Sequence, residues 1–278
     1  MKAAIIGCGY VGTAVARHWQ DQGVDVLATT TRSDRLSELS AVANQVKVLT
    51  GTDTAQLRAA LSDCQVALLC VGPKRGASYV ETYLNTAQTL ANVLPETDIR
   101  QLIYTSSYAV YGQHHGVWVT EMMPPAPSTE KGEILAATEQ TLLASASPQR
   151  QICVLRLGGI YGPGRTVESI YGRAAGTTRP GKGAEYSNWI HIEDIVGAID
   201  WACQQRLAGI YNLVQDEILT VRELIGRVCD RQNLAPVQWD ESQPSRRTHN
   251  VRVSNTKLKS TGYQFVHPTF WPSLEQTK

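Results

Sequence analysis

A glycine-rich loop near the start of the chain constrains the fold more than any other feature of the sequence. Residues 2–7 read KAAIIG, a short apolar run that ends in glycine and is typical of a buried strand. The residues that follow, CGYVGTAVARHWQDQG, have the apolar spacing of a helix that stops at Gly23. Gly7, Gly9 and Gly12 therefore fall in the turn between a strand and a helix, in the pattern G-x-G-x-x-G.

Each glycine of this loop has its own physical reason. Gly7 permits a tight turn, Gly9 lets a pyrophosphate approach the backbone, and Gly12 lets the helix pack closely on the strand. The first turn of the helix offers N–H groups and a partial positive charge to phosphates. The loop predicts a dinucleotide site whose cofactor contacts are Gly7, Gly9, Tyr10, Val11 and Gly12. The alternative is a glycine turn without a ligand.

Strand-like and helix-like runs alternate over the first part of the chain. Strands are expected at residues 2–7, 24–31, 45–51, 65–72, 100–107 and 151–159, and helices at 10–23, 33–44, 54–64, 78–95 and 129–145. Ser33 is expected to cap the second helix. Such alternation favours a parallel sheet with helices on both faces. The predicted fold class is α/β, a doubly wound parallel sheet with a small C-terminal lobe.

The alternation of strand-like and helix-like runs loosens after Gly158, which suggests a domain boundary near this point. We expect residues 1–157 to form the dinucleotide-binding domain, with a helix at 192–206 packing back on it. Residues 158–278 are expected to form a smaller substrate lobe, in which Thr220 begins a helix. Open α/β sheets bind ligands at the carboxyl ends of their strands, where such a lobe would lie.

Composition excludes several classes of function. The formal net charge of +1 gives no electrostatic reason to expect nucleic acid or a membrane surface as partner. No apolar run approaches the roughly 18 residues of a membrane span. The six cysteines are scattered without a CxxC pair, and the N-terminus lacks a secretory pattern. We therefore expect reduced thiols in a cytoplasmic protein, and no metal site, since no His/Cys spacing fits zinc.

The end of the second predicted strand bears on which dinucleotide is bound. Sites that prefer NAD usually place an acidic residue there, for the adenosine ribose. This strand ends ATTTRS, without a carboxylate. Arg32, between Thr31 and Ser33, can instead hold a 2′-phosphate with its guanidinium fork. The prediction is NADP over NAD, unless Arg32 is a solvated surface residue.

Six stretches carry a resemblance to one superfamily: IIGCGYVG, LIYTSSYAVYG, LRLGGIYGPGR, WIHIEDIVGAI, GIYNLV and VSNTKLKSTGY. The chain resembles the atypical or extended short-chain dehydrogenases/reductases of the NAD-dependent epimerase/dehydratase superfamily, and among them the YeeZ-like branch. The resemblance implies a Rossmann fold, NAD(P) binding and oxidoreductase, epimerase or dehydratase chemistry. Further cofactor contacts are then expected from Val71, Gly72, Thr105 and Ser106.

The resemblance also shows what this chain lacks. In that superfamily a serine at the end of the fifth strand orients the reacting oxygen, and Ser107 matches it. A Tyr-x-x-x-Lys pair on the next helix supplies a phenol whose pKa the lysine lowers. Aligning on Glu139 places these two positions at Lys131 and Leu135, so the motif reads KGEIL. The usual phenol–ammonium couple is therefore missing from this helix.

The catalytic candidates are Ser107, Tyr111 and Lys131, and each has a structural alternative. Ser107 orients a substrate or merely ends a strand. Lys131 donates a proton or holds an anion, or it is a solvated lysine in the first turn of a helix. Tyr111 points into the cleft or packs between lobe and domain. His191 and Asp194, in WIHIED, are interpreted as structural, with Asp194 helping the helix to begin.

The substrate is expected to be a small and anionic molecule, such as a nucleotide-sugar-like compound. Cations outnumber the single acidic residue, Glu168, between residues 156 and 182: Arg156, Arg165, Arg173, Arg179 and Lys182, with Arg246 and Arg247 further on. The alternative is a scattered, solvated face. A homodimer through residues 78–94 and 129–145 is expected by analogy with the family. The alternatives to an enzyme are a non-catalytic NADP(H)-binding sensor or regulator, and an interaction protein with an empty cleft.

Overall fold

The computed structural model describes residues 1–73 and 76–271, which divide into two compact units. Unit 1 consists of residues 1–107, 130–156 and 195–211. Unit 2 consists of residues 108–129, 157–194 and 212–278. Each unit therefore brings together segments that lie far apart in the sequence.

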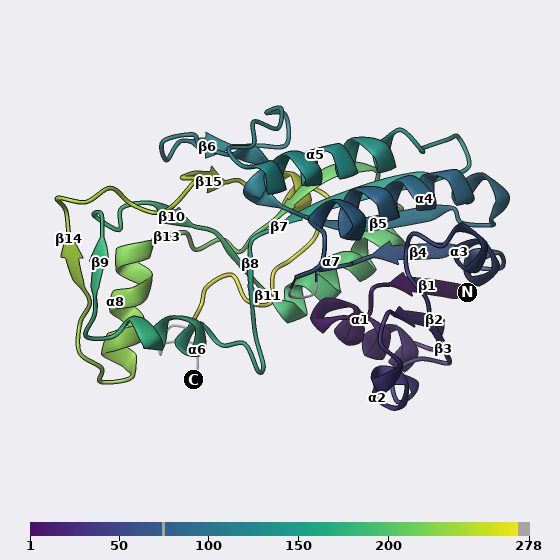
Figure 1. Cartoon of the computed structure of the whole chain (residues 1–278), viewed down its shortest axis with the longest axis horizontal. Coiled ribbons are helices and arrows are strands. Elements are labelled where there is room, and N and C mark those ends of the chain that lie inside the picture. The colour runs from purple at the N-terminus through teal and green to yellow at the C-terminus, as the bar shows by residue number, and fades with distance from the viewer. Residues whose placement is uncertain (74–75, 272–278) are drawn as a thin grey trace. The chain divides into compact units, whose positions relative to one another are not determined.

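Unit 1 is built on a seven-stranded sheet in the order β12-β7-β5-β4-β1-β2-β3 (Figure 1). The neighbouring pairs from β5 to β3 are parallel, and Ala4 of β1 lies between Leu27 of β2 and Ala67 of β4. This is the doubly wound order, in which the chain moves outward from β1 in both directions. The strands are β1 (Lys2–Ile6), β2 (Asp25–Thr30), β3 (Gln45–Val48), β4 (Val66–Leu69), β5 (Gln101–Ser107), β7 (Gln151–Leu157) and β12 (Gly209–Leu213).

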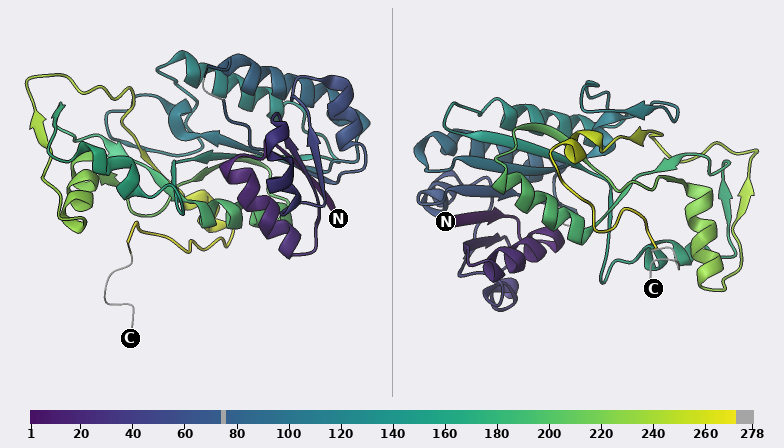
Figure 2. Two further views of the ribbon diagram at one scale, coloured as in Figure 1. Left: turned by 60° about the horizontal axis from the view of Figure 1, so that its bottom comes forward. Right: turned by 180° about the vertical axis from the view of Figure 1, so that it is seen from behind.

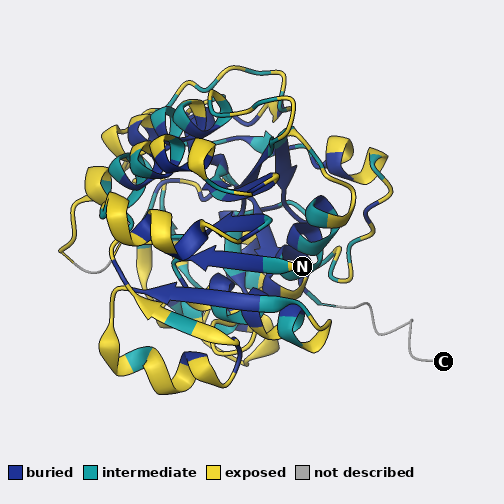
Figure 3. Cartoon of the chain, turned by 90° about the vertical axis from the view of Figure 1, so that its right-hand side faces the viewer, coloured by how far each residue is buried: buried dark blue, intermediate teal, exposed yellow. Residues whose placement is uncertain are grey.

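Helices cover both faces of this sheet (Figure 2). An apolar cluster joins one face to α3 (Thr54–Leu61), α4 (Thr86–Val93) and α5 (Glu130–Leu143), through Leu57, Leu90 and Leu142. On the other side Trp19 of α1 (Tyr10–Asp21) donates its indole N–H to Asp200 of α7 (Ile192–Gln204), at 3.2 Å. The inner strands are accordingly buried, whereas the edge strand β3 and the outer helix faces are largely exposed (Figure 3). Shorter elements are η1 (Ser33–Arg35), α2 (Leu36–Ser40), the π turn η2 (Glu81–Asn85) and η3 (Leu94–Glu96).

Unit 2 consists of short strand pairs and short helices. The pair β10–β13 is antiparallel, and the pairs β8–β11, β9–β14 and β6–β15 are parallel. The strands are β6 (Trp118–Val119), β8 (Gly159–Tyr161), β9 (Thr178–Pro180), β10 (Tyr186–Ser187), β11 (Trp189–His191), β13 (Leu219–Thr220), β14 (Gln238–Asp240) and β15 (Arg252–Val253). The helices are η4 (Tyr108–Tyr111), α6 (Val167–Tyr171), η5 (Gly172–Ala174), α8 (Val221–Arg231) and α9 (Thr256–Ser260).

The α/β class and the doubly wound parallel sheet are confirmed. Thr220 begins α8 as expected, in a capping box with Glu223: its Oγ1 accepts the N–H of Glu223 (3.2 Å), whose carboxylate accepts the N–H of Thr220 (2.8 Å). The prediction for Ser33 was wrong. Ser33 lies inside the 3-10 turn η1, which starts from Arg32 without a side-chain cap.

The state of the cysteines and the character of the helices bear on two expectations from the sequence. All six cysteines are free, as expected, and five of them are buried. Within residues 1–73 and 76–271, no helix combines the length and the apolar character needed to traverse a lipid bilayer.

Candidate functional site

The glycine loop lies between β1 and α1 and is held by the strands on either side. Gly7 has a φ of +93°, which glycine adopts without strain. Its N–H donates to Thr29 Oγ1 (3.2 Å), and the N–H of Cys8 donates to the carbonyl of Thr29 (2.9 Å). A Cβ on Gly7 would lie 2.8 Å from the Cα of Val71, which follows β4. The end of β2 and the segment after β4 therefore fix the loop's path.

The other two glycines of the loop have opposite surroundings. A Cβ on Gly12 would lie 2.8 Å from the carbonyl oxygen of Gly7 and 2.9 Å from Cys70 Sγ, so α1 packs as closely as a glycine permits. A Cβ on Gly9 would meet no heavy atom within 4 Å, and Gly9 starts α1 without a side-chain cap. Gly72 is equally open. A free approach to the backbone at Gly9 is the geometry that a pyrophosphate needs.

The first residues of α1 and the residues after β2 border this opening. Tyr10 is 40% exposed, whereas Val11 is buried against the sheet side of α1. Thr30 ends β2 with its Oγ1 accepting the N–H of Arg32 at 3.1 Å. Thr31, Arg32 and Ser33 are exposed. The predicted contacts of the loop and of the β2 end thus belong to one part of unit 1.

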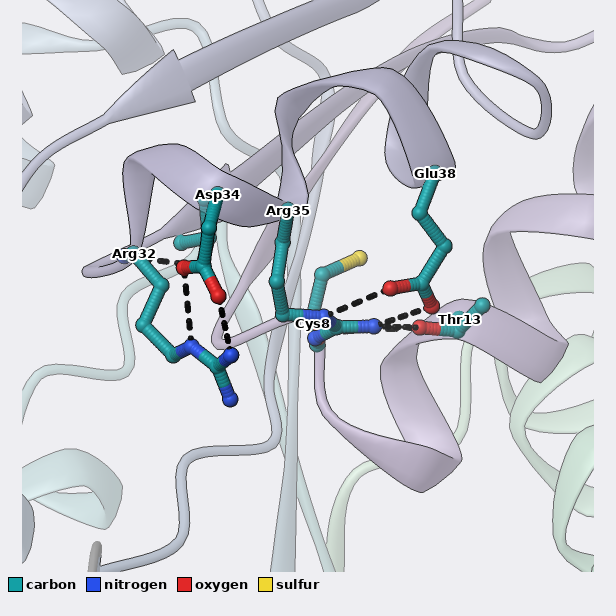
Figure 4. Close-up of polar contacts among 7 residues, drawn as sticks. Cys8, Thr13, Arg32, Asp34, Arg35 and Glu38 are labelled. Atoms are coloured by element: carbon teal, nitrogen blue, oxygen red, sulfur yellow. Dashed lines mark hydrogen bonds and ion pairs between the residues drawn. The ribbon is translucent and has the colours of Figure 1, made fainter.

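Two arginines follow β2, and each has a carboxylate partner (Figure 4). Arg32 binds Asp34 through both Nε (3.0 Å) and Nη2. Arg35 reaches the glycine loop: Nη1 donates to the carbonyl of Cys8, and Nη2 donates to Thr13 Oγ1 of α1 (3.2 Å). Arg35 also binds Glu38 (2.6 Å), and this guanidinium lowers the pKa of that carboxyl.

Arg32 was predicted from the sequence to contact the coenzyme, whereas Arg35 was not. The sequence does contain a signal for Arg35. It follows Arg32 by three residues, so in a helical turn both side chains can lie on the same face. What the sequence does not show is the contact with the carbonyl of Cys8, which depends on how η1 packs beside the glycine loop.

A buried polar network stands at the carboxyl end of β5. Ser106 Oγ donates to Glu139 Oε1 (2.5 Å), and Arg156 donates to both oxygens of that carboxylate, from Nη2 at 2.7 Å. Glu139 and Arg156 are each 1% exposed. Arg156 was predicted to belong to a cluster of cations around an anionic substrate, and that prediction is wrong. Its charge is matched by that of Glu139, because a buried guanidinium requires a carboxylate partner.

Alternation along β5 separates the two serines. Ser106 faces α5, so its hydroxyl is engaged in the buried network, and Ser107 faces the opposite side of the strand. Ser107 is half-buried at the last position of β5. Thr105, also half-buried, makes a long hydrogen bond with the carbonyl of Leu69 (3.4 Å). Ser107 therefore ends β5 on the side away from the buried network, and its role in orienting a substrate stays a prediction.

Lys131 has an aromatic neighbour that the sequence did not reveal. Its Nζ lies 5.5 Å from the centroid of the Tyr79 ring, and the Tyr79 ring lies 4.6 Å from that of Tyr83. Lys131 lies in the first turn of α5, and Tyr79 lies in the helical segment that leads into η2 and α4. Burial raises the pKa of Tyr79 and that of Tyr83. Protonated phenols therefore stand beside Lys131.

Tyr111 lies in unit 2 and is fully buried. Its hydroxyl donates to Asn212 Oδ1 (2.8 Å), and the Nδ2 of Asn212 donates to the carbonyl of Ser254 (2.9 Å). Apolar neighbours such as Val119 and Val253 complete this cluster. Proton transfer by Tyr111 would require that the bond to Asn212 first break.

Comparison with known proteins agrees with this geometry. The model of the NAD dependent epimerase/dehydratase family matches residues 3–213. Protein YeeZ of Escherichia coli (strain K12) is 31% identical over 218 residues, which are 76% of this chain and 77% of that protein. The low-salt glycan biosynthesis protein Agl12 of Haloferax volcanii is 26% identical over 198 residues, covering 67% of this chain and 63% of its own.

Solved structures show the same fold. A functionally unknown conserved protein from Silicibacter pomeroyi has a TM-score of 0.78 and 25% identity, over 97% of this chain and 95% of its own. The UDP-glucose 4-epimerase of Thermus thermophilus, solved with NAD, has a TM-score of 0.78 and 20% identity, over 95% of this chain and 94% of its own. From the family match over residues 3–213 and the 31% identity to YeeZ, the chain belongs to the NAD dependent epimerase/dehydratase family.

Proposed function

We propose that unit 1 binds NADP(H) at the glycine loop and that the chain is a reductase, epimerase or dehydratase of small, oxygenated, anionic substrates. One observation carries the choice of NADP: Arg35 contacts the carbonyl of Cys8 in the loop, and Arg32 stands beside it at the end of β2. A guanidinium fork matches the oxygens of a 2′-phosphate. Asp34 and Glu38, the carboxylates that follow β2, are both bound to arginines.

The two coenzymes would compete differently for these groups. An NAD ribose needs a carboxylate to accept its hydroxyl hydrogens, so Asp34 or Glu38 would have to leave an arginine. A 2′-phosphate carries a charge of about −1.5 to −2 and three acceptor oxygens, so it can replace a carboxylate at a guanidinium. The Arg32 side chain is 52% exposed and can turn towards such a group. The exchange favours the phosphorylated coenzyme.

Binding measurements on single variants test the choice of coenzyme. Arg35→Ala and Arg32→Ala should each weaken NADPH by about 10- to 100-fold, since a hydrogen bond to a charged group contributes about 1.5–3 kcal/mol. NADH should lose less than about threefold. Arg58→Ala is the matched control, because Arg58 forms its ion pair with Glu96, outside the loop, η1 and α2. NADPH and NADH should keep their wild-type affinities in that variant.

Asp34→Asn distinguishes an NADP site from an NAD site more sharply than the arginine variants do. It releases the Arg32 guanidinium from its carboxylate, so NADPH should bind more tightly while NADH changes little. If Asp34 instead accepts ribose hydroxyls, Asp34→Asn will weaken NADH and leave NADPH unchanged. That pattern would assign the site to NAD and reject the proposal.

For the chemistry, the proposal assigns Ser107, Lys131 and Tyr79 to the substrate side. The bound coenzyme would supply hydride transfer. Ser107 would donate a hydrogen bond to the reacting oxygen. Tyr79, whose pKa is raised by burial, stays protonated near neutral pH and can donate a proton to that oxygen. Lys131, against the face of the Tyr79 ring, would orient the phenol and attract an anionic substrate.

Turnover separates an enzyme from the alternative, a non-catalytic NADP(H)-binding sensor. NADPH oxidation is measured with a panel of carbonyl compounds and nucleotide sugars. Tyr79→Phe should lower kcat by about 100-fold, the order expected for loss of a general acid, and Lys131→Gln should also lower kcat because the phenol is no longer oriented; neither should change the Kd for NADPH. Lys47→Ala on β3 serves as the lysine control. Tight NADPH binding without turnover of any substrate on the panel would favour the sensor.

Four predictions from the sequence stay predictions. They are the substrate lobe at residues 158–278, the remaining cations as a site for an anionic substrate, the homodimer through residues 78–94 and 129–145, and the cytoplasmic location. Catalysis by Tyr111 also stays a prediction, although the bond to Asn212 gives its hydroxyl a structural role.

A further inference from the structure

A cluster of two histidines and a glutamate lies in unit 2, apart from the residues assigned above to the coenzyme and the reaction. His191 ends β11, Glu193 lies in the first turn of α7, and His267 belongs to the segment that follows α9. Each offers one ligand atom, and these atoms all lie within 4.8 Å of one another. Within residues 1–73 and 76–271, this is the one such group of three metal-ligating side chains.

A fully buried carboxylate holds the cluster together. Asp194 accepts the N–H of Val266 at Oδ1 (2.7 Å) and the N–H of His267 at Oδ2 (2.9 Å). The hydroxyl of Tyr263 donates to the carbonyl of Asp194 (2.9 Å). Asp194 lies in the first turn of α7, which it was expected to help begin, and its side chain also fixes the segment after α9 to the start of α7. His267 is therefore placed by the fold and not by chance.

The side chains already lie at distances close to those of a metal site. His267 Nε2 and Glu193 Oε2 are 2.7 Å apart, and the rings of His191 and His267 have centroids 3.7 Å apart. A tetrahedral Zn²⁺ about 2.0–2.1 Å from each ligand would separate two ligand atoms by about 3.3 Å. The Glu193 side chain is 60% exposed and can retreat by this small amount.

Apart from the contact between His267 and Glu193, which an ion would replace, few existing bonds oppose metal binding. His191 accepts at Nδ1 one long hydrogen bond, from the N–H of Glu193 (3.3 Å), so its imidazole gives up little when it turns to a metal. Two imidazoles and a carboxylate form the donor set of zinc sites with three protein ligands, in which water takes the fourth position. Borderline ligands of this kind select transition metals over Mg²⁺ or Ca²⁺.

We propose that His191, Glu193 and His267 bind one divalent transition metal ion, for which Zn²⁺ fits the donor set. The ion would clamp the segment around His267 to the start of α7. Sequence spacing concealed this site, because the two histidines stand in WIHIED and YQFVHPTF, which lie far apart in the sequence. The inference is independent of the proposed coenzyme and reaction.

Zinc titration of the chelator-treated full-length chain tests the proposal. In competition with a chromophoric chelator, one equivalent of Zn²⁺ should bind per chain. Glu193→Gln and His267→Gln should each weaken binding by about tenfold or more, since even groups that only orient ligands contribute about 10- to 100-fold. His18→Gln is the matched control: His18 also lies near a carboxylate, Asp200 (3.6 Å), but does not belong to the group of three ligands. It should bind Zn²⁺ like the wild type.

Two further readouts do not depend on activity. Co²⁺ bound at the site should show the intense visible absorption of four-coordinate cobalt, and Glu193→Gln should lose it. Zn²⁺ should raise the Tm of the wild type and of His18→Gln, but not that of Glu193→Gln. Because the Glu193 side chain is 60% exposed, its replacement should not disturb folding, so misfolding would not explain the missing Tm shift. Absence of saturable one-to-one uptake, or equal uptake by the wild type, Glu193→Gln and His18→Gln, would overturn the proposal.

Discussion

Alanine at Gly9 and alanine at Gly12 should fail in different ways, because two glycines of one loop have different surroundings. On Gly12 the added Cβ would lie 2.8 Å from the carbonyl oxygen of Gly7 and 2.9 Å from Cys70 Sγ. That carbonyl cannot easily retreat, since it accepts the N–H of Gly9 (2.8 Å) and the thiol of Cys70 (3.1 Å). On Gly9, whose φ is −86°, the same atom would meet nothing within 4 Å.

These surroundings set the expected loss of stability. Overpacking at Gly12 should lower the free energy of unfolding by about 1–3 kcal/mol. At about 2–4 °C per kcal/mol for a protein of this size, Tm should fall by roughly 2–12 °C. At Gly9 the loss of a glycine N-cap costs about 0.5 kcal/mol. A stiffer unfolded chain offsets this by about 0.4–1 kcal/mol, so Gly9→Ala should leave the stability nearly unchanged.

Coenzyme affinity should show the reverse pattern: Gly9→Ala should weaken binding, although it leaves the stability nearly unchanged. The methyl group of Gly9→Ala occupies space through which a pyrophosphate would approach the backbone, so NADPH should bind about tenfold or more weakly, a loss of at least about 1.4 kcal/mol. The measurements are thermal unfolding and NADPH fluorescence titration of the same samples. Gly226→Ala on α8 is the control, because its Cβ would also meet nothing within 4 Å.

Two outcomes would refute this reasoning. If Gly9→Ala folds normally and binds NADPH like the wild type, the coenzyme does not lie against the loop at Gly9. If Gly12→Ala is as stable as Gly226→Ala, the close contact with the carbonyl of Gly7 does not constrain the packing of α1 on the sheet.

Three further predictions concern stability. Glu139→Gln should lower the free energy of unfolding, measured in urea, by about 3–5 kcal/mol, because it leaves Arg156 charged and buried without a carboxylate partner. The double variant Glu139→Leu, Arg156→Met should lose much less. Equal losses for the two variants would contradict this account. Burial, and then Arg247, lower the pKa of His249, which lies 3.0 Å from the hydroxyl of Tyr108. The unfolded chain therefore takes up a proton below about pH 6.5 that the folded chain resists, so stability present above that pH declines as the pH falls. His249→Gln should flatten this decline, and parallel pH profiles would argue against it. Thr220→Ala should cost about 1 kcal/mol by removing the cap of α8, while Thr220→Ser should restore most of it; guanidinium unfolding distinguishes them.

The first half of the fold was predictable because its signals are local. The apolar run of β1, the glycine turn and the helical spacing of α1 lie within about 20 residues and each has a clear period. The strand pairs of unit 2 carry no such signal. Trp118–Val119 pairs with Arg252–Val253, and two residues are too few to show alternation. Their pairing is decided by packing between distant segments, which a single sequence does not display.

The residues of the candidate site likewise divide into those that the sequence could predict and those that only the structure reveals. The need for glycine in the loop could be predicted from the sequence, since Gly7 and Gly12 occupy positions where a Cβ would collide with neighbouring atoms. The different directions of Ser106 and Ser107 also follow from the alternation of a strand, although only the structure identifies Glu139 as the partner of Ser106. The contact of Lys131 with Tyr79 requires that α5 pack beside the helical segment leading into α4, so no spacing rule could find it.

The charges beside the glycine loop explain why the coenzyme should be recognised at short range. Arg32 with Asp34 and Arg35 with Glu38 are two ion pairs, so together they add no net charge to a chain whose formal charge is +1. A field that sums to nearly zero, screened beyond about 8–10 Å at physiological salt, cannot steer an anion from a distance. In the proposed site, discrimination would then come from exchange at contact, in which a phosphate replaces Glu38 on Arg35, held against the loop by Cys8 and Thr13, or replaces Asp34 on Arg32. The carboxylates of the proposed site would then regulate affinity as much as the arginines do, and removing Asp34 should strengthen the NADPH binding that removing Arg32 weakens.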